Sequence, residues 1–323
     1  MPELNKDRAI VRILHEVAGE QGVRVDSIGE GWILRLTRGS MTRFLHGYAL
    51  DLNTAATHAI ANDKAATSDV LTAAGIANVE HRLFLHPKMA QFVVHLGNWE
   101  PMLRYAREHA FDVVVKDNQG TGGRGVYRAR SEVQLEQAVY RLFEQTNAVA
   151  ISPYFEAPVE HRFIMLGGKC EAAYTKLRPT VVGDGRRTVL EILASQVSAQ
   201  GSAGPVSRLI ASMDEEAVAG LGEVLPAGTT RLLNWRHNLG QGATVRMLDC
   251  ASREAEAGLR LATGAASAMN LAYGSVDVIE TAAGPRVMEV NSGLMMEFLA
   301  RSIDGGYELA RRVYRRAFEM MFA

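Results

Sequence analysis

The 323-residue sequence has only two cysteines, Cys170 and Cys250, and no apolar run that approaches the ~20 residues of a membrane-spanning helix. Two cysteines provide neither a disulfide framework nor a cysteine-rich metal site. The chain has 35 basic and 36 acidic residues, so no general attraction for nucleic acid is expected. Residues 1–12 are charged and lack the apolar core of a signal peptide. These absences predict a cytoplasmic protein that binds neither nucleic acid nor membranes.

Hydrophobic residues make up 47% of the chain and charged residues 22%, which is enough for a large core and two or three structural units. Apolar spacing predicts helices at residues 10–18, 64–74, 133–143, 252–271 and 307–322. Strands are expected at residues 32–36, 41–45, 111–116, 126–129, 148–155, 160–166 and 170–176. Residues 197–229 are small and polar and are expected to form an insertion with helical pieces. The mixture predicts an α+β (α/β) fold.

Residues 273–293 (YGSVDVIETAAGPRVMEVNSG) have the pattern of a β-hairpin, because two apolar runs flank a turn-rich segment. A hairpin centred on Ala283 places Asp277 opposite Glu289 and puts Asn291 on the same face. Facing carboxylates repel each other. A divalent cation such as Mg²⁺ removes the conflict, since it takes carboxylate and amide oxygens. A surface hairpin with solvated acids is the alternative, and this stretch alone favours neither.

A glycine-rich segment, residues 118–125 (NQGTGGRG), follows a buried-strand pattern that ends on Lys116. Such a loop can bring backbone N–H groups close to phosphate oxygens. No helix follows directly, which excludes a Walker loop and a dinucleotide fingerprint. Lys116 and Arg124 favour a cover for a triphosphate over a simple hairpin tip. Asp63 is expected to cap a helix with Lys64 in its first turn, where a cation is unfavourable unless an anion is near.

Six motifs in this order resemble the ATP-grasp superfamily, and most closely its amino-acid and peptide ligases: cyanophycin-synthetase cores, bifunctional glutathione synthetases and RimK-like glutamate ligases. The motifs are NDK before a leucine-containing helix and a Gly-Ile pair, VVVK with GTGGRGV, EHRFIMLGGK, TVVGDGRRTVLEI, RHNLGQGA, and the D…EVN hairpin. They cover about residues 30–300. The resemblance implies an ATP-grasp fold with an N-terminal pre-ATP-grasp region (1–110), a small lid lobe with the glycine-rich loop (111–155), and a C-terminal lobe with the Mg²⁺ and substrate site (156–323).

The resemblance also implies roles for individual residues. Three residues match groups that act on the transferring phosphoryl group and are expected to be catalytic: Lys116, Arg162 and Arg236. Three match the ligands of Mg²⁺, with Mn²⁺ as an alternative ion: Asp277, Glu289 and Asn291. The other expected ATP contacts are Lys64 and Lys116 at the phosphates, Gly120, Thr121, Gly122, Gly123 and Gly125 of the flexible loop, Ser152, Tyr154 and Phe155 of the adenine hinge, Glu160 near the ribose, and Lys176 and Asn238.

Two departures from the resembled pattern bear on specificity. Relatives usually have Glu or Gln in the hinge, where this sequence has Ser152 and Pro153, so adenine is expected to be read by backbone groups. Relatives often have a proline-containing turn after EVN, whereas here residues 292–297 read SGLMME. That segment is expected to border the acceptor site, so the substrate cannot be copied from a relative.

The implied function is an ATP-dependent carboxylate–amine ligase, which forms an amide or peptide bond through an acyl-phosphate and releases ADP and phosphate. An amino acid or small peptide is the expected substrate. The alternatives are a kinase-like ATP-grasp phosphotransferase and a ligase that adds glutamate to a protein. A nucleotide-binding module without catalysis is a third reading, which the complete set of matched residues opposes. A homo-oligomer is compatible with the sequence.

Overall fold

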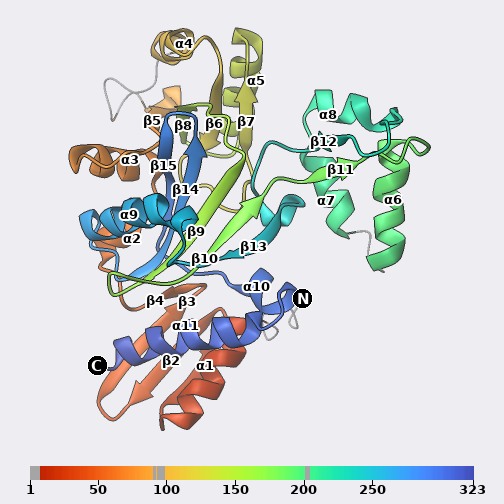
Figure 1. The fold of residues 1–323 in the computed structure, drawn as a ribbon. Helices are drawn as coiled ribbons and strands as arrows, with labels where there is room; N and C mark the ends of the chain where they lie inside the picture. Colours follow the sequence, from red (N-terminus) through yellow and green to blue (C-terminus); the bar gives the residue numbers. More distant parts are fainter. Residues whose placement is uncertain (1–7, 90–91, 93–98, 201–203) are drawn as a thin grey trace.

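A computed structural model describes residues 8–89, 92, 99–200 and 204–323. In this part of the chain the strands form a five-stranded central sheet, two four-stranded sheets and one two-stranded ribbon, with helices packed around them (Figure 1). The fold is mixed α and β, as the sequence predicts. Among the described helices, none combines the length and the apolarity that a bilayer crossing demands.

The N-terminal and C-terminal segments of the chain share one core. An antiparallel sheet in the order β1-β2-β3-β4 packs against helices from both segments (Figure 1). The strands are β1 (Arg24–Ile28), β2 (Ile33–Arg38), β3 (Met41–His46) and β4 (Ala49–Leu50), and the helices are α1 (Ala9–Glu20), α10 (Glu297–Ser302) and α11 (Gly306–Met321). The predicted division at residue 156 assigned α10 and α11 to the C-terminal lobe alone, whereas their apolar faces are buried against the N-terminal region.

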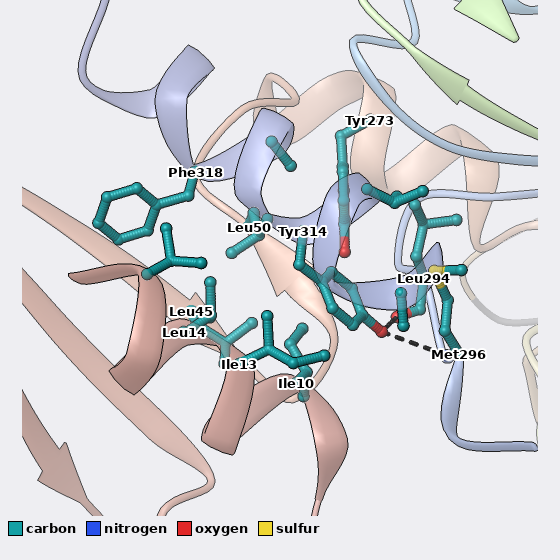
Figure 2. Packing of buried hydrophobic residues seen from close by; sticks show 14 of the residues in the cluster. Ile10, Ile13, Leu14, Leu45, Leu50, Tyr273, Leu294, Met296, Tyr314 and Phe318 are labelled. Atoms are coloured by element: carbon teal, nitrogen blue, oxygen red, sulfur yellow. Dashed lines mark hydrogen bonds between the residues drawn. The ribbon is translucent and has the colours of Figure 1, made fainter. Parts of the chain in front are cut away.

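Figure 2 shows how side chains of α1 and α11 pack against each other in this core. Ile10, Ile13 and Leu14 of α1 meet Phe318 and Tyr314 of α11, and all five are fully buried. The hydroxyl group of Tyr314 donates a hydrogen bond to the carbonyl oxygen of Leu294 (2.7 Å) and accepts one from the backbone nitrogen of Met296 (3.1 Å). These bonds tie the segment that follows the 273–291 hairpin to the N-terminal core.

The central sheet has the antiparallel order β13-β10-β9-β14-β15. Its strands are β9 (Val159–Leu166), β10 (Lys169–Leu177), β13 (Thr244–Leu248), β14 (Tyr273–Thr281) and β15 (Gly284–Asn291). One face carries the apolar side chains of Phe163, Val276 and Val278 and is covered by α9 (Arg253–Ala268), with α2 (Ala55–Ala61) and α3 (Lys64–Ala73) in the same core. Because side chains alternate along a strand, the residues between these apolar positions point to the opposite face.

A second four-stranded sheet, in the order β5-β8-β6-β7, lies at the other end of the molecule (Figure 1). It consists of β5 (Arg82–Leu85), β6 (Val113–Asp117), β7 (Val126–Ala129) and β8 (Ala148–Pro153), packed on α4 (Trp99–Glu108) and α5 (Glu132–Phe143), and the short helix η1 (Pro87–Met89) follows β5. The predicted lid lobe began at residue 111. In the structure β5 pairs with β8 and α4 shares the core, so this unit starts near residue 82.

The predicted insertion, residues 197–229, is part of a larger subdomain that extends to one side in Figure 1. It contains β11 (Thr180–Val182), α6 (Val189–Gln200), α7 (Gly204–Ser212), α8 (Glu215–Ala219), η2 (Gly220–Gly222) and β12 (Thr230–Leu232). The subdomain has a small core of its own, which includes Val181, Leu193, Leu209 and Leu233. Residues 201–203 lie outside the described part of the chain. Near η3 (Leu239–Gln241) the chain returns from the subdomain to the central sheet.

Candidate functional site

The predicted hairpin exists, and a bulge sets its register. Thr281 pairs with Gly284, so the turn is centred between Ala282 and Ala283 rather than on Ala283. Val278 pairs with Val287, but Asp277 pairs with Glu289, so Met288 is the extra residue of a β-bulge. Without this bulge Asp277 would lie opposite Met288. The predicted pairing of Asp277 with Glu289 is therefore correct, and it depends on a bulge that the pattern did not predict.

The carboxylate of Asp277 is neutralised by protein cations. It is 2% exposed and accepts hydrogen bonds from Arg162 Nε at 2.6 Å and from Lys176 Nζ at 3.0 Å. Burial raises the pKa of Asp277, but the charges of Arg162 and Lys176 outweigh burial and bring the pKa to about 2. Lys176 also bonds Glu160, which lies opposite it on β9. The structure thus resolves the predicted repulsion around Asp277 with an ion cluster of Arg162, Lys176, Glu160 and Asp277.

Lys64 and Glu289 connect the hairpin with the glycine-rich loop. The carboxylate of Asp63 accepts a hydrogen bond from the Ala66 backbone nitrogen at 2.8 Å, so α3 begins at Lys64 as predicted. Lys64 Nζ donates to the Gly120 carbonyl oxygen at 2.6 Å and lies 3.8 Å from Glu289 Oε1. The Lys64 side chain is 11% exposed and that of Glu289 is 31% exposed. One lysine therefore contacts both the loop and the edge strand of the central sheet.

Lys116 lies beside this pair, on β6 of the second sheet. Its ammonium group is 3.1 Å from His81 Nε2 and 3.6 Å from Met288 Sδ. Burial lowers the pKa of Lys116 to about 8, with Glu289 opposing this shift and Lys64 adding to it. Lys64, His81, Met288 and Glu289 line one pocket. Neither His81 nor Met288 was predicted as a site residue, and a lone histidine between two strands has no sequence signature.

The glycine-rich loop lies against the RHNLGQGA segment. Gln241 Nε2 donates to the Gly123 carbonyl oxygen at 3.2 Å, and Arg236 Nη2 donates to the Val126 carbonyl oxygen at 2.5 Å. A Cβ atom on Gly123 would lie 2.2 Å from Asn238 Nδ2, and Gly123 has a φ of +69°. Only glycine fits this position. The structure thus places Asn238 against the loop, and Gln241 is a further contact that the sequence interpretation missed.

Arg236 is not part of the ion cluster around Asp277. Besides Val126, its guanidinium donates to the Ser212 carbonyl oxygen at 2.6 Å, and it stacks on Trp235 with 4.6 Å to the ring centroid. Its Nε atom is buried without a hydrogen-bond partner among the described residues. Arg236 thereby joins the end of α7 to the strand that leaves the glycine-rich loop. Arg162 and Arg236, predicted together as catalytic cations, have separate sets of partners in this structure.

Comparison with known proteins shows which families and structures this chain is similar to. Residues 207–314 match the RimK-like ATP-grasp domain family. The chain is similar to a bifunctional glutathione biosynthesis protein of Lactiplantibacillus plantarum (31% identity over 184 residues, 56% of this chain and 23% of that protein) and to a cyanophycin synthetase of a Nostoc species (25% over 196 residues, 57% and 20%). A crystal structure of a bifunctional glutathione synthetase from Pasteurella multocida aligns with 97% of this chain and 45% of its own, at 18% identity and a TM-score of 0.55.

The chain has the ATP-grasp fold. The predicted fold class is confirmed, and so is the predicted resemblance to ATP-grasp ligases. The matched region spans only about a fifth of the length of the two curated relatives, so their activities are not transferred to this chain directly.

The expected adenine hinge lies at the end of β8. Ser152 is 1% exposed and pairs with Val114 of β6. Phe155 packs with Val79, Ala157, Ile279 and Met288 in an apolar cluster next to the ammonium group of Lys116. An apolar wall beside a cation suits a nucleobase attached to phosphates. The Tyr154 side chain points elsewhere: its hydroxyl donates to Glu156 at 2.6 Å and its ring lies under Arg128.

The residues predicted to bind Mg²⁺ fit such an ion in part. The described residues contain no group of three or more His, Cys, Asp or Glu side chains that could hold a metal. Mg²⁺ in ATP sites needs only one or two carboxylates besides phosphate and water. Glu289 is partly exposed and has Lys64 at 3.8 Å, and Asn291, whose amide oxygen would be the ligand, lies two residues further along β15 on the same face. Glu289 and Asn291 therefore fit, whereas Asp277 is occupied by Arg162 and Lys176.

Proposed function

We propose that this protein is an ATP-dependent carboxylate–amine ligase that acts on an amino acid or small peptide. The observation that most directly supports this proposal is the position of Lys116. It is a partly buried lysine that forms no ion pair within 4 Å with a described carboxylate, because Glu289 pairs with Lys64 and Asp277 pairs with Arg162 and Lys176. An ammonium group that is desolvated without a counter-ion is costly unless a ligand supplies the negative charge.

The surrounding residues suit the phosphates of ATP as that ligand. Lys64 lines a pocket together with His81, whose ring bonds Lys116, and the glycine-rich loop is bonded to Lys64 on one side and to Gln241 on the other. Phosphoryl transfer needs positioning and charge neutralisation rather than a nucleophilic side chain. Lys116 would bind the transferring phosphoryl group, whereas Arg162, on β9 of the central sheet, is paired with Asp277. Mg²⁺, held by Glu289 and Asn291, would neutralise phosphate charge.

The proposed reaction has two steps. A substrate carboxylate oxygen attacks the γ-phosphorus of ATP, which forms an acyl-phosphate and releases ADP. An amine nitrogen then attacks the acyl carbon, the carbon–oxygen bond to phosphate breaks, and an amide and inorganic phosphate leave with a proton. Between the two steps the acyl-phosphate has to be protected from water. The contacts of the loop with Lys64 and Gln241 support a role as that cover.

The substrate class rests on the relatives. One of them takes part in glutathione biosynthesis, and glutathione is a small peptide; another is a cyanophycin synthetase. We extend this class to the present chain as part of the proposal. We also expect the protein in the cytoplasm, where ATP is abundant and where its two free cysteines stay reduced.

The test is ATP-dependent release of ADP and phosphate against a panel of amino acids and dipeptides, with mass spectrometry of the products. An amide, formed with loss of water, is expected, and ADP release should depend on the amine. Lys116→Ala and Glu289→Ala should abolish turnover, while Lys169→Ala, at the exposed first residue of β10, should not. A product that gains phosphate without an amine would replace the ligase with a phosphotransferase. Normal turnover in folded Lys116→Ala would overturn the proposal.

A further inference from the structure

His81 is an unassigned buried histidine at the wall of the proposed phosphate site. It is 4% exposed and lies just before β5. Three contacts fix the segment that carries it. The backbone nitrogen of His81 donates to Ser68 Oγ at 3.1 Å, and the backbone nitrogen of Val79 donates to the Val287 carbonyl oxygen at 2.8 Å. Ser68 in turn donates to Asn78 Oδ1 at 2.9 Å. The segment that carries the ring is therefore held by both α3 and β15.

The hydrogen bonds of the ring determine its tautomer. Nδ1 lies 2.9 Å from the carbonyl oxygen of Val79, which can only accept, so Nδ1 carries the proton. In a neutral ring Nε2 is then an acceptor, and it faces Lys116 Nζ at 3.1 Å. Burial, with the charges of Lys116 and Lys64, lowers the pKa of His81 well below its ordinary value, in agreement with a neutral ring. The ammonium group of Lys116 is the donor in this bond.

We infer that His81 is a positioning residue for Lys116: its Nε2 accepts one hydrogen bond from the ammonium group, which directs the other two N–H groups at the phosphates of the nucleotide. This inference rests on the proposed function. Lys116 otherwise has only the weak acceptor Met288 Sδ, at 3.6 Å, among its described contacts. A flexible lysine without His81 would turn toward Glu289, whose charge acts on it. The protein thus fixes a phosphate-binding lysine with a neutral acceptor, which leaves its positive charge for the ligand.

The test measures the affinity for ADP without metal, by calorimetry in EDTA, so that no Mg²⁺ ligand contributes. His81→Phe removes the acceptor and keeps an aromatic ring, whereas His81→Gln keeps an acceptor oxygen at a similar reach. His81→Phe should weaken ADP binding roughly tenfold, as expected for one hydrogen bond to a charged group. His81→Gln should stay within about threefold of wild type. His161→Gln is the matched control, because His161 is equally buried and bonds Thr175 at 2.9 Å instead of a lysine.

A double-mutant cycle separates positioning from general structural damage. In a Lys116→Met background, His81→Phe should cause no further loss of ADP affinity. An equal loss in both backgrounds, or no loss in either, would overturn the inference while the nucleotide site stands. A wild-type protein that does not bind ADP would overturn the proposed function and this inference with it. If His81→Phe does not fold, His81→Asn carries the same expectation, because its shorter amide does not reach Lys116.

Discussion

Arg162 of β9 holds the carboxylate of Asp277 of β14 through two hydrogen bonds, from Nε at 2.6 Å and from Nη2 at 2.5 Å. The two residues are paired on adjacent strands, so the bidentate contact crosses the sheet directly. Lys176 adds a third bond at 3.0 Å. The charge of Asp277 in the central sheet is therefore neutralised by cations of the same sheet, whereas Lys116, on β6 of the second sheet, forms no ion pair with a described carboxylate. This difference in pairing distinguishes residues that stabilise the sheet from a residue whose charge is available to a ligand.

Asp277→Asn should destabilise the protein by about 3–5 kcal/mol, because it leaves Arg162 and Lys176 buried without their common counter-charge. The measurement is urea unfolding near neutral pH. Asp26→Asn is the control, since Asp26 forms a solvent-exposed ion pair with Arg35 and should cost far less. Equal losses of unfolding free energy in the two variants would contradict the structural role given to Asp277.

Nucleotide affinity should fall as the pH rises through about 8. The pKa of Lys116 is lowered to about 8, first by burial; Lys64 adds to this shift and Glu289 and Glu160 oppose it. A bound phosphate prefers the ammonium form, so above pH 8 binding has to take up a proton, and affinity declines by up to about tenfold per pH unit. Calorimetry of metal-free ADP between pH 7 and 9.5 measures this decline.

Lys116→Arg provides the control for that pH profile, because a guanidinium keeps its charge over this range. Its ADP affinity should be lower than in wild type, since the geometry at His81 changes, but it should not decline above pH 8. The same decline in both proteins would assign the titration to a group other than Lys116.

The sequence predicts the local elements well. Asp63 caps α3, a helix forms within residues 252–271, and the hairpin forms between Ser275 and Val290, because capping residues, glycines and apolar periodicity act over short distances. The grouping of elements was predicted less well. β5 joins the sheet of β6, β7 and β8, and α11 joins the N-terminal core. Both placements depend on contacts between residues far apart in the chain.

The same division holds within the candidate site. Lys64, Lys116 and Glu289 were predicted from motifs. In the structure Lys64 and Glu289 line one pocket, and Lys116 contacts His81 and Met288, which also line it. The partners that orient them were not predicted. His81 reaches Lys116 from 35 positions away, and Met288 reaches it only because a bulge turns that residue out of the ladder. Neither contact leaves a local pattern, since each joins residues that are far apart in the chain.

Gly123→Ala should impair the closed glycine-rich loop. The added Cβ would lie 2.2 Å from Asn238 Nδ2, at a residue with a φ of +69°. Amide synthesis should fall by at least about tenfold, and ADP release without an amine should rise relative to synthesis, because an open loop admits water to the acyl-phosphate. Coupled assays of ADP and amide measure this ratio.

Gly168→Ala is the matched control for the loop variant. Gly168 has a φ of +77° in the turn between β9 and β10, and a Cβ there meets nothing within 4 Å. Gly168→Ala should therefore lose about 1–2 kcal/mol of stability through backbone strain, without a steric clash. Its ratio of ADP to amide should equal that of wild type. A change in that ratio would show that backbone strain, rather than contact with Asn238, explains the Gly123 result.

Glu289→Gln should have opposite effects with and without metal. Without Mg²⁺, the substitution removes a negative charge 3.8 Å from Lys64, so ADP should bind as tightly as to wild type or more tightly. With Mg²⁺, turnover should fall at least about a hundredfold, since a carboxylate ligand that neutralises phosphate charge is lost. Glu280→Gln on the same hairpin, where the carboxylate lies 4.0 Å from His161, should change neither quantity. A protein in which Glu289 serves only as a partner of Lys64 would show altered ADP affinity and an unchanged Mg²⁺ requirement, so the difference between the two measurements decides whether Glu289 binds the metal.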